Sequence, residues 1–472
     1  MRATVQNHDT RRRWASAVVL ILSAAFLLGC GTASTTTTAT RPAVTLPEPQ
    51  LVAMASELVD ELARNDFAAA TQRFDDTMKR ALPESSLRDA WRSLIKQVGS
   101  FKQRAGTRTE VTNGYQMVFV TAQFALARLV VKVMFDAEGR VAGLFFLPEG
   151  ASAGYASPSY VDAGAFSERE VTVGSGEWAL PGTLTVPKVA GPFPAVVLVH
   201  GSGPNDRDES IGPNKPFKDL AQGLATQGIV VLRYEKRTKF YQQRMAGAAE
   251  TITAKEETVD DAVAAVALLR QTPEVDPDRV FVLGHSLGGM LAPRILQAQP
   301  GAAAGMIIVA GPSRPLEDIV LEQTRYISSL SATLSPEDQA ALRELEAQVA
   351  RVKDLGLSTS IPSRDLPLGI PAAYWLDLRS YSQVETARTL GKPALILQGA
   401  RDYQVTEVDL EGWKAGLDGR ANVRFILYPD LNHLFMLGEG KATPSEYNLP
   451  GNVAAQVITD IAGWVKESTG SR

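Results

Sequence analysis

A serine at a sharp strand-to-helix turn is the feature that most constrains what this chain can fold into. The segment GHSLGG, residues 284–289, follows an apolar run at residues 279–283 and leads into a helix-like stretch at residues 290–299. This setting is typical of a nucleophile elbow, in which a strained turn exposes a serine hydroxyl beyond the end of a buried strand. We therefore expect a sheet flanked by helices, with Ser286 as a nucleophile.

The same five-residue pattern, G-x-S-x-G, occurs a second time with Ser152 at its centre. That copy follows a Pro-Glu pair and runs into residues 155–159, which contain Ser and Pro and have no helical periodicity. The surroundings indicate a linker, not a strand followed by a helix. We expect Ser152 to take no part in chemistry.

A serine hydroxyl is a weak nucleophile until a base removes its proton, and histidine is scarce in this chain. The four histidines are His8, His200, His285 and His433. His8 lies in a leader segment, His285 adjoins the serine too closely to face its hydroxyl, and His200 closes an earlier strand, where we interpret it as bracing a loop. His433 follows the strand-like residues 423–427 and is the predicted base.

A carboxylate must then orient the imidazole and stabilise its protonated form. Asp402 is the predicted acid, because it lies two residues after the segment 398–400 that ends a buried-strand pattern at 393–397. Asp409 and Asp430 are the alternatives. Ser286, Asp402 and His433 each follow a predicted strand, and the carboxyl ends of parallel strands meet at one edge of a sheet.

An acyl-transfer site also needs N–H donors for a developing oxyanion. The N–H of Leu287, directly after the nucleophile, is one predicted donor. The loop HGSGP at residues 200–204 follows a strand, and its glycines allow close approach of the backbone to a substrate. We assign the second donor to Ser202, with Gly201 or Gly203 as alternatives.

These motifs together resemble those of bacterial α/β-hydrolases of the esterase and serine-aminopeptidase type. The resemblance covers about residues 166–472, and the pieces that carry it are HGSGP at 200–204, RYEKR at 233–237, GHSLGG at 284–289, QGARD at 398–402 and LNH at 431–433. Their order along the chain, serine then aspartate then histidine, is also that of the family. The resemblance implies a doubly wound, mostly parallel sheet, a Ser-His-Asp triad, carboxylesterase activity, and no cofactor or metal.

Strand and helix signals alternate through this region, as such a sheet requires, until the chain reaches residue 311. About 80 residues then precede the strand before Asp402, which is longer than a connecting loop needs. We interpret residues 313–390 as a helical cap, with one helix starting near Ser335. Tyr326, Tyr374 and Trp375 are candidates to line a pocket, although ordinary packing explains them equally well.

The amino terminus resembles a bacterial lipoprotein signal. Three arginines at residues 11–13 precede a mostly apolar run at 14–28, which is short for a membrane span and suits a signal peptide. Cys30, the only cysteine, follows directly and is the predicted lipidation site; a signal with an incidental cysteine is the alternative. We expect residues 1–29 to be removed and the protein to be an extracytoplasmic, membrane-anchored lipoprotein of the cell envelope.

Two further segments separate the signal from the hydrolase-like region. Residues 30–50 are rich in Thr, Ala and Pro and indicate a tether. Residues 51–150 combine helical periodicity with strand signals joined by a hairpin turn at Asn113-Gly114, which predicts a small α+β domain. This domain resembles the uncharacterised module fused ahead of bacterial secreted hydrolases, and we find no catalytic constellation in it.

The charge of the chain limits the classes of molecule that it is expected to bind. The formal net charge is −4 and no basic cluster follows the leader, which argues against nucleic acid as a partner. The expected partners are a small ester substrate and, through the lipid anchor, a membrane, while the oligomeric state stays open.

The motifs leave several functions open beside ester hydrolysis. An aminopeptidase or dipeptidyl-peptidase-like enzyme would use the same triad, with Glu322 or Asp377 to bind the amino terminus of its substrate, and a thioesterase would also use it. A cell-envelope protein with a hydrolase-like scaffold and no catalysis is the remaining alternative.

Overall fold

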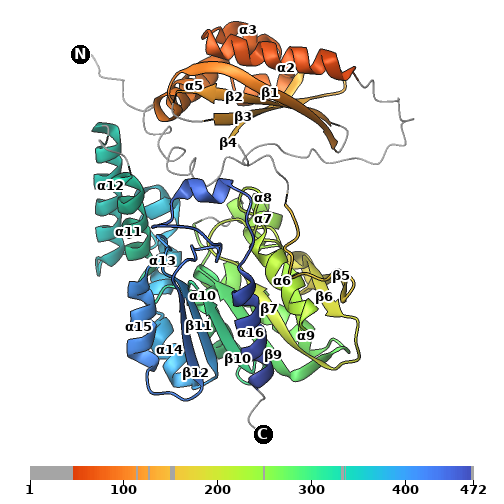
Figure 1. Ribbon diagram of the computed structural model, residues 1–472. Coiled ribbons are helices and arrows are strands. Elements are labelled where there is room, and N and C mark those ends of the chain that lie inside the picture. Colours follow the sequence, from red (N-terminus) through yellow and green to blue (C-terminus); the bar gives the residue numbers. More distant parts are fainter. Residues whose placement is uncertain are drawn as a thin grey trace, which may run out of the picture. The chain divides into compact units, whose positions relative to one another are not determined.

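The computed structural model describes residues 46–468, apart from residues 113–114, 126–127, 149–154, 248–249, 331–333 and 335. Cys30, Ser152 and the predicted hairpin turn at Asn113-Gly114 lie outside the described residues. The chain separates into two compact units, a smaller one up to residue 148 and a larger one formed mainly by residues 155–446 and 451–468 (Figure 1).

The smaller unit consists of helices followed by an antiparallel sheet. The helices are α2 (Glu48–Ala63), α3 (Phe67–Gln72), α4 (Asp76–Ala81) and α5 (Glu84–Val98), and the strands, in spatial order, are β1 (Phe101–Thr112), β2 (Tyr115–Phe124), β3 (Arg128–Phe135) and β4 (Val141–Pro148). Leu58 and Leu62 of α2 and Trp91 of α5 belong to the same buried cluster as Val120 and Val131 of the sheet. This unit is the small α+β domain that the sequence predicts.

The helical pattern through Phe67, Phe74 and Met78 indicates one helix, but the structure has two short ones, α3 and α4. An aspartate caps each: Asp66 accepts a hydrogen bond from Ala69 N at 3.1 Å, and Asp75 accepts one from Met78 N at 2.6 Å. Caps of this kind compete with continuing a helix. The intervening Phe74 instead forms an isolated bridge with Val141.

The larger unit contains an eight-stranded sheet in the order β12-β11-β10-β9-β7-β8-β6-β5. Its strands are β5 (Phe166–Val173), β6 (Leu180–Pro187), β7 (Phe193–Val199), β8 (Val230–Tyr234), β9 (Val275–His285), β10 (Gly305–Val309), β11 (Ala394–Gly399) and β12 (Val423–Tyr428). The pairs from β12 to β8 are parallel, whereas β6 is antiparallel to both β8 and β5. The prediction of a doubly wound, mostly parallel α/β-hydrolase sheet is confirmed.

Helices cover both faces of this sheet, as the figure shows (Figure 1). The helices α6 (Pro216–Thr226) and α16 (Ala455–Glu467) contribute to one buried cluster. The helices α9 (Asp260–Arg270), α10 (Leu287–Ala298), α14 (Gln383–Leu390) and α15 (Glu407–Leu417) contribute to the other. Because the central strands are buried on both faces, they read as continuous apolar runs, such as AVVLV at residues 195–199.

The segment between β10 and β11 is helical. It carries α11 (Leu316–Ser329), α12 (Pro336–Lys353), α13 (Ala372–Arg379) and α14. Tyr374 and Trp375 of α13 are buried within the larger core, with 5% and 1% of their surface exposed, so they pack and do not line an open pocket. Tyr326 of α11 stacks on Tyr403 with ring centroids 5.1 Å apart.

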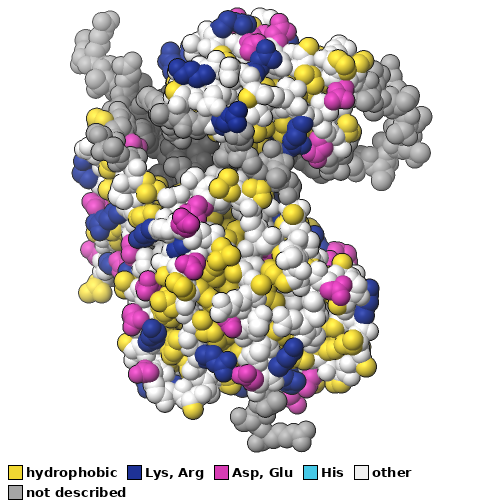
Figure 2. All heavy atoms as spheres, in the orientation of Figure 1, with side chains coloured by type: hydrophobic (Ala, Val, Ile, Leu, Met, Phe, Trp, Pro, Cys, Tyr) yellow, Lys and Arg dark blue, Asp and Glu magenta, His cyan; other side chains and the backbone are white. Residues whose placement is uncertain are grey.

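Charged side chains of both signs are interspersed on the faces of the two units seen in Figure 2. A surface of this kind offers no extended basic region on that view for a polyanion. Within the described ranges, no helix is both long and apolar enough to cross a membrane.

Candidate active site

Ser286 lies at the turn between β9 and α10, with a backbone φ of 53° and ψ of −117°. A positive φ is unfavourable for a residue with a side chain and indicates stored backbone strain. The turn is held from the neighbouring strand, because Ser286 N donates a hydrogen bond to Val309 O at 2.9 Å. This is the geometry expected of a nucleophile elbow.

The two glycines of the elbow are required by close backbone contacts. A Cβ atom on Gly284 would lie 2.1 Å from Gly288 O, and one on Gly288 would lie 2.3 Å from Val199 O. Any side chain at either position would therefore collide with the backbone. The glycines let α10 start directly against the ends of β9 and β7.

His433 and Asp402 form a buried pair. His433 Nδ1 lies 2.7 Å from Asp402 Oδ2, within hydrogen-bond distance, and the two residues are 4% and 2% exposed. Asp402 follows β11, and His433 lies in the loop after β12. The strand β12 is at the edge of the sheet and pairs with β11. The structure thus brings together the predicted acid and the predicted base.

The loop around Asp402 supplies donors to the carboxylate. Its Oδ1 accepts hydrogen bonds from Gln404 N at 2.7 Å and Val405 N at 3.1 Å, and its Oδ2 accepts one from Gln398 Nε2 at 3.3 Å. Three such hydrogen bonds fix the direction of the carboxylate. The carboxylate is therefore held in position from its own loop while it faces His433.

The two alternative acids have other surroundings. Asp409 is fully buried and accepts hydrogen bonds from Ser313 N at 3.0 Å and from Arg314 Nη2 at 2.7 Å, so it holds the start of the segment after β10. Asp430 is exposed. The carboxylate beside Nδ1 of His433 belongs to Asp402.

Ser286 and His433 are linked through His285. His285 Nε2 lies 3.0 Å from His433 O, and the two imidazole rings have centroids 4.7 Å apart. Among the residues that the structure describes, His433 Nε2 makes no hydrogen bond. That nitrogen is therefore the one left to exchange a proton with Ser286 or a substrate, and such bonds are often long before a substrate binds.

The loop after β7 lies against the nucleophile. A Cβ atom on Gly201 would be 3.2 Å from Ser286 Cβ, so this loop runs directly beside the serine. Gly201 N donates a hydrogen bond to Glu209 Oε1 at 2.6 Å and is not available to an oxyanion. Ser202 is exposed, and within the described part of the chain no acceptor is found for its N–H.

His200 braces this loop. Its Nε2 lies 3.0 Å from Asp206 O, and its ring packs against Tyr234 and Phe217 with centroids 5.3 and 5.0 Å away. Burial lowers the pKa of His200 to about 4, so the ring is neutral near pH 7. The interpretation of His200 as a structural residue agrees with these contacts.

A second buried histidine–carboxylate pair, which the sequence does not reveal, lies beside the first. His285 Nδ1 is 2.9 Å from Glu209 Oε2, and both side chains are almost fully buried. Burial alone would disfavour the charged imidazole, but the Glu209 carboxylate outweighs it and raises the pKa of His285. The same pairing outweighs burial at the carboxylate and lowers the pKa of Glu209.

Sequence reasoning also missed Lys236 and Glu257. Lys236 Nζ donates a hydrogen bond to Gly201 O at 2.8 Å and lies 3.0 Å from Glu257 Oε1. The available signal was the charged run at residues 235–237 directly after the buried strand β8. Glu209 had a comparable signal, since it ends the charged run 206–209 just after the loop that follows β7.

The carboxylates considered for binding a peptide amino terminus are already engaged. Glu322 Oε2 lies 2.6 Å from Arg314 Nη2, and Asp377 forms two hydrogen bonds with Arg294 at 2.7 and 2.8 Å. A carboxylate that is neutralised by an arginine is a weaker ligand for a second cation. Asp377 therefore presents no unpaired negative charge, whereas Glu322 shares Arg314 with Asp409, so that these three side chains together keep one negative charge.

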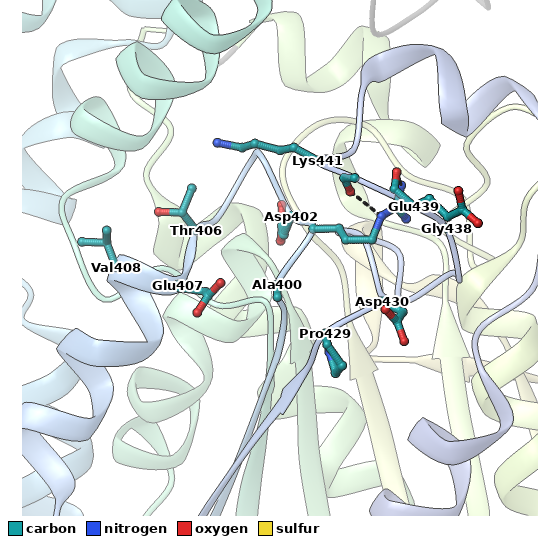
Figure 3. A pocket seen from close by; sticks show the side chains of 12 residues that line it. Ala400, Asp402, Thr406, Glu407, Val408, Pro429, Asp430, Gly438, Glu439 and Lys441 are labelled. Atoms are coloured by element: carbon teal, nitrogen blue, oxygen red, sulfur yellow. Dashed lines mark hydrogen bonds between the residues drawn. The ribbon is translucent and has the colours of Figure 1, made fainter.

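An open pocket of about 580 Å³ lies beside the loop that carries Asp402 (Figure 3). Thr406 and Glu407 line one side of it, and Asp430 and Glu439 line the other. Arg401 shapes this loop, since its Nε donates a hydrogen bond to Gly440 O at 2.6 Å. Asp402 lines the pocket, whereas Ser286 and His433 do not.

No group of three His, Cys, Asp or Glu side chains in the described ranges is arranged to hold a metal ion. The reactive side chains at the elbow are a serine hydroxyl, two imidazoles and the carboxylates that pair with them.

Known proteins match both units. Residues 192–439 match the family described as serine aminopeptidase, S33, and residues 55–144 match a family described as a protein of unknown function (DUF3887). Esterase EstD of Thermotoga maritima is 42% identical over 407 residues, which cover 86% of this chain and 93% of that protein.

Solved structures with a similar fold are more distant in sequence. Est1E from Butyrivibrio proteoclasticus is 14% identical with a TM-score of 0.40, and the match covers 63% of this chain and 98% of that one. Dipeptidyl peptidase 4 of Porphyromonas gingivalis is 17% identical with a TM-score of 0.42, and the match covers 76% of this chain and 43% of that one.

Proposed function

This chain belongs to the serine aminopeptidase, S33, family of α/β-hydrolases, and we propose that it is a serine carboxylesterase acting on esters with small or medium acyl groups. The relationship to an esterase along most of both chains supports ester hydrolysis over peptide hydrolysis. The engagement of Asp377 by Arg294 also favours an ester, which has no charged amino terminus to bind. Thioesters are a second substrate class open to the same chemistry.

In the proposed reaction, Ser286 is the nucleophile and His433 the general base. His433 Nε2 takes the proton of the Ser286 hydroxyl as its oxygen attacks the ester carbonyl carbon. The resulting imidazolium is stabilised by Asp402 at Nδ1 and then gives the proton to the departing alcohol. The carbonyl carbon is left bonded to Ser286 as an acyl-enzyme.

The second half of the reaction repeats these steps with water. His433 takes a proton from a water molecule, whose oxygen attacks the acyl carbon, and the proton then returns to the Ser286 oxygen as the acid leaves. The N–H groups of Leu287 and Ser202 are the proposed donors to the carbonyl oxygen when it carries negative charge. Leu287 N–H belongs to the first turn of α10, where backbone donors have no partner within the helix.

One observation carries this proposal. His433 has its Nδ1 fixed by a buried carboxylate, while its Nε2 makes no hydrogen bond to any described residue, and the histidine adjacent to Ser286 contacts its backbone. This arrangement supports a general base, because a carboxylate at Nδ1 favours the tautomer in which Nε2 is the basic nitrogen.

The first test is Ser286→Ala, with Ser152→Ala as the matched control. We expect Ser286→Ala to lose at least about 10⁴-fold in kcat on short-chain p-nitrophenyl esters, because the acyl acceptor is gone. A fluorophosphonate probe should label the wild type and the control and leave Ser286→Ala unlabelled. Retained turnover in Ser286→Ala would reject the assignment, and an unlabelled wild type would favour a non-catalytic scaffold.

We also propose that the protein is a lipoprotein anchored through Cys30, with residues 1–29 as its signal peptide. The proposed tether ends before α2 at Glu48, not at residue 50 as the composition predicts. The apolar run before the cysteine supports this location. In bacteria fed an alkyne-labelled fatty acid, the wild type should carry the label and sediment with membranes, and Cys30→Ser should lose the label. A Cys30→Ser chain that keeps the label would contradict the proposal.

A further inference from the structure

The peptide group between Gly201 and Ser202 is held by buried Lys236 and by partly buried Asn205, whose Nδ2 donates a hydrogen bond to Gly201 O at 3.2 Å. Its carbonyl, Gly201 O, accepts a hydrogen bond from Lys236 Nζ at 2.8 Å. On the other side of Gly201, the N–H donates to Glu209 Oε1 at 2.6 Å. Both polar groups of Gly201 are thus engaged by charged side chains.

This anchoring sets the direction of the next N–H. Cis peptide bonds among the described residues occur only at Gly191-Pro192, so the bond between Gly201 and Ser202 is trans. In a trans peptide the C=O and the following N–H point in opposite directions. Because Gly201 O points toward buried Lys236, the Ser202 N–H points away from it, on the exposed side of the loop.

Lys236 is in turn connected, through Glu257, to Tyr374 of α13, which belongs to the segment between β10 and β11. Its Nζ lies 3.0 Å from Glu257 Oε1, and Glu257 Oε2 accepts a hydrogen bond of 2.6 Å from the hydroxyl of Tyr374 on α13. Glu257 lies in a π-helical turn, η3 (Lys255–Val259), that precedes α9. Such turns are uncommon and often occur at functional sites.

All three side chains of this connection are shielded from solvent. The Lys236 side chain is 3% exposed, the Glu257 side chain is 10% exposed, and Tyr374 is 5% exposed. A buried ion pair adds little net stability compared with apolar packing, because both charges must lose their hydration. Here the lysine also reaches a loop carbonyl beside the nucleophile, since a Cβ on Gly201 would be 3.2 Å from Ser286 Cβ.

We propose that Lys236, Glu257 and Tyr374 are positioning residues that orient the Gly201–Ser202 peptide, so that α13 helps to set the oxyanion donor. This rests on the proposed esterase function and extends it to residues that touch neither substrate nor reacting atoms. Oxyanion donors act only when placed within a few tenths of an ångström, and a displacement of 1 Å can cost about 10²-fold in rate.

Lys236→Met tests the charged contact to the loop carbonyl. We expect kcat on a p-nitrophenyl ester to fall about 10- to 100-fold with KM changed less than about 3-fold, because the donor serves the transition state more than the bound ester. The rate of labelling by a fluorophosphonate should fall in parallel, since its phosphoryl oxygen needs the same donors. A normal kcat with a raised KM would overturn the proposal.

Tyr374→Phe is the smaller change, and it tests the positioning role if Lys236→Met does not fold. It removes one hydroxyl, and we expect kcat to fall about 3- to 10-fold with KM unchanged. Tyr381→Phe is the matched control, because it removes a hydroxyl that donates to Met290 O of α10 at 2.9 Å and does not reach the loop. Its kcat should stay within about 2-fold of the wild type.

The outcomes separate this inference from the proposed function. If Ser286→Ala hydrolyses esters like the wild type, the esterase assignment fails and the positioning role fails with it. If Ser286→Ala is inactive while Tyr374→Phe and folded Lys236→Met keep the wild-type kcat, only the positioning role is wrong. An equal loss in Tyr374→Phe and Tyr381→Phe would also overturn it, because it would reflect general loosening around α13.

Discussion

Two buried histidine–carboxylate pairs lie side by side in the larger unit, and they differ in how the second ring nitrogen is used. In the pair of His433 with Asp402, Nδ1 faces the carboxylate and Nε2 makes no hydrogen bond to a described residue. In the pair of His285 with Glu209, Nδ1 faces the carboxylate and Nε2 faces the His433 carbonyl. The two pairs therefore differ at Nε2, the nitrogen through which we propose that His433 acts as a base.

The difference also explains why the two histidines have separate roles next to one serine. His285 faces a carboxylate with one ring nitrogen and a carbonyl with the other, and so links Glu209 to the His433 backbone. Burial lowers its pKa, but the Glu209 carboxylate outweighs burial and raises it. His433 has a carboxylate at Nδ1 and no described hydrogen-bond partner at Nε2, which is the arrangement that the proposed general base requires. The four predictions below follow from this contrast, from the largest effect to the smallest.

His433→Gln should cause the largest loss. We expect kcat on p-nitrophenyl esters to fall about 10⁴- to 10⁶-fold, because no other group can take the Ser286 proton. The matched variant His285→Gln should retain far more activity, since His285 acts only as a link. Equal losses in the two variants would remove the distinction between the pairs.

Asp402→Asn should rank second. We expect a loss of about 10⁴-fold in kcat, because an amide beside Nδ1 favours the wrong tautomer and cannot stabilise the imidazolium. The pH dependence of kcat should be measured on the same variant, and activity should recover partly at high pH. A loss below about 10-fold would mean that another carboxylate serves His433.

Glu209→Gln should mainly affect stability. Removing one partner of a buried pair leaves the other charge uncompensated, and we expect a loss of about 3 kcal/mol in the free energy of unfolding, measured in urea. Gln retains an oxygen for the Gly201 N–H, so kcat should fall about 10-fold or less. A loss of kcat as large as that of Asp402→Asn would contradict the assigned roles.

The pH dependence of stability should give the smallest signal. The pKa of His285 is raised in the folded protein. Its contribution to the free energy of unfolding is therefore complete below pH about 6.5, the ordinary pKa of histidine, and is lost as the pH rises through the raised pKa. The pKa of Glu209 is lowered in the folded protein. Its contribution to the free energy of unfolding is therefore complete above pH about 4.3, the ordinary pKa of glutamate, and is lost as the pH falls through the lowered pKa.

The difference in unfolding free energy between the wild type and Glu209→Gln should therefore be greatest between about pH 4.3 and 6.5 and decline on both sides. Urea unfolding at a series of pH values measures it. A difference that stays constant from the acidic to the alkaline side would show that His285 carries no pH-dependent charge in this pair.

The sequence predicts the elements that depend on local pattern. The apolar runs before Ser286, Asp402 and His433 mark buried strands, and the residues directly after such strands lie at one edge of the sheet. The elbow glycines mark the tight turn for the same local reason. The pair of His433 with Asp402 could therefore be predicted from the sequence alone.

The second pair could not be expected, because its contacts come from separate elements. Glu209 follows the loop after β7, and His285 ends β9, so only the folded sheet brings them together. Lys236, Glu257 and Tyr374 likewise meet from three parts of the chain. The break between α3 and α4 was missed for a different reason, since two capping aspartates outweigh the apolar spacing there.

The positive φ of Ser286 lowers the stability of the fold at the residue whose hydroxyl the proposed reaction requires. A glycine would take this conformation with less strain, whereas a residue with a side chain raises the energy of the native state, on the order of 1 kcal/mol or more. Replacing Ser286 by glycine would therefore relieve this strain and at the same time remove the hydroxyl that we propose as the nucleophile.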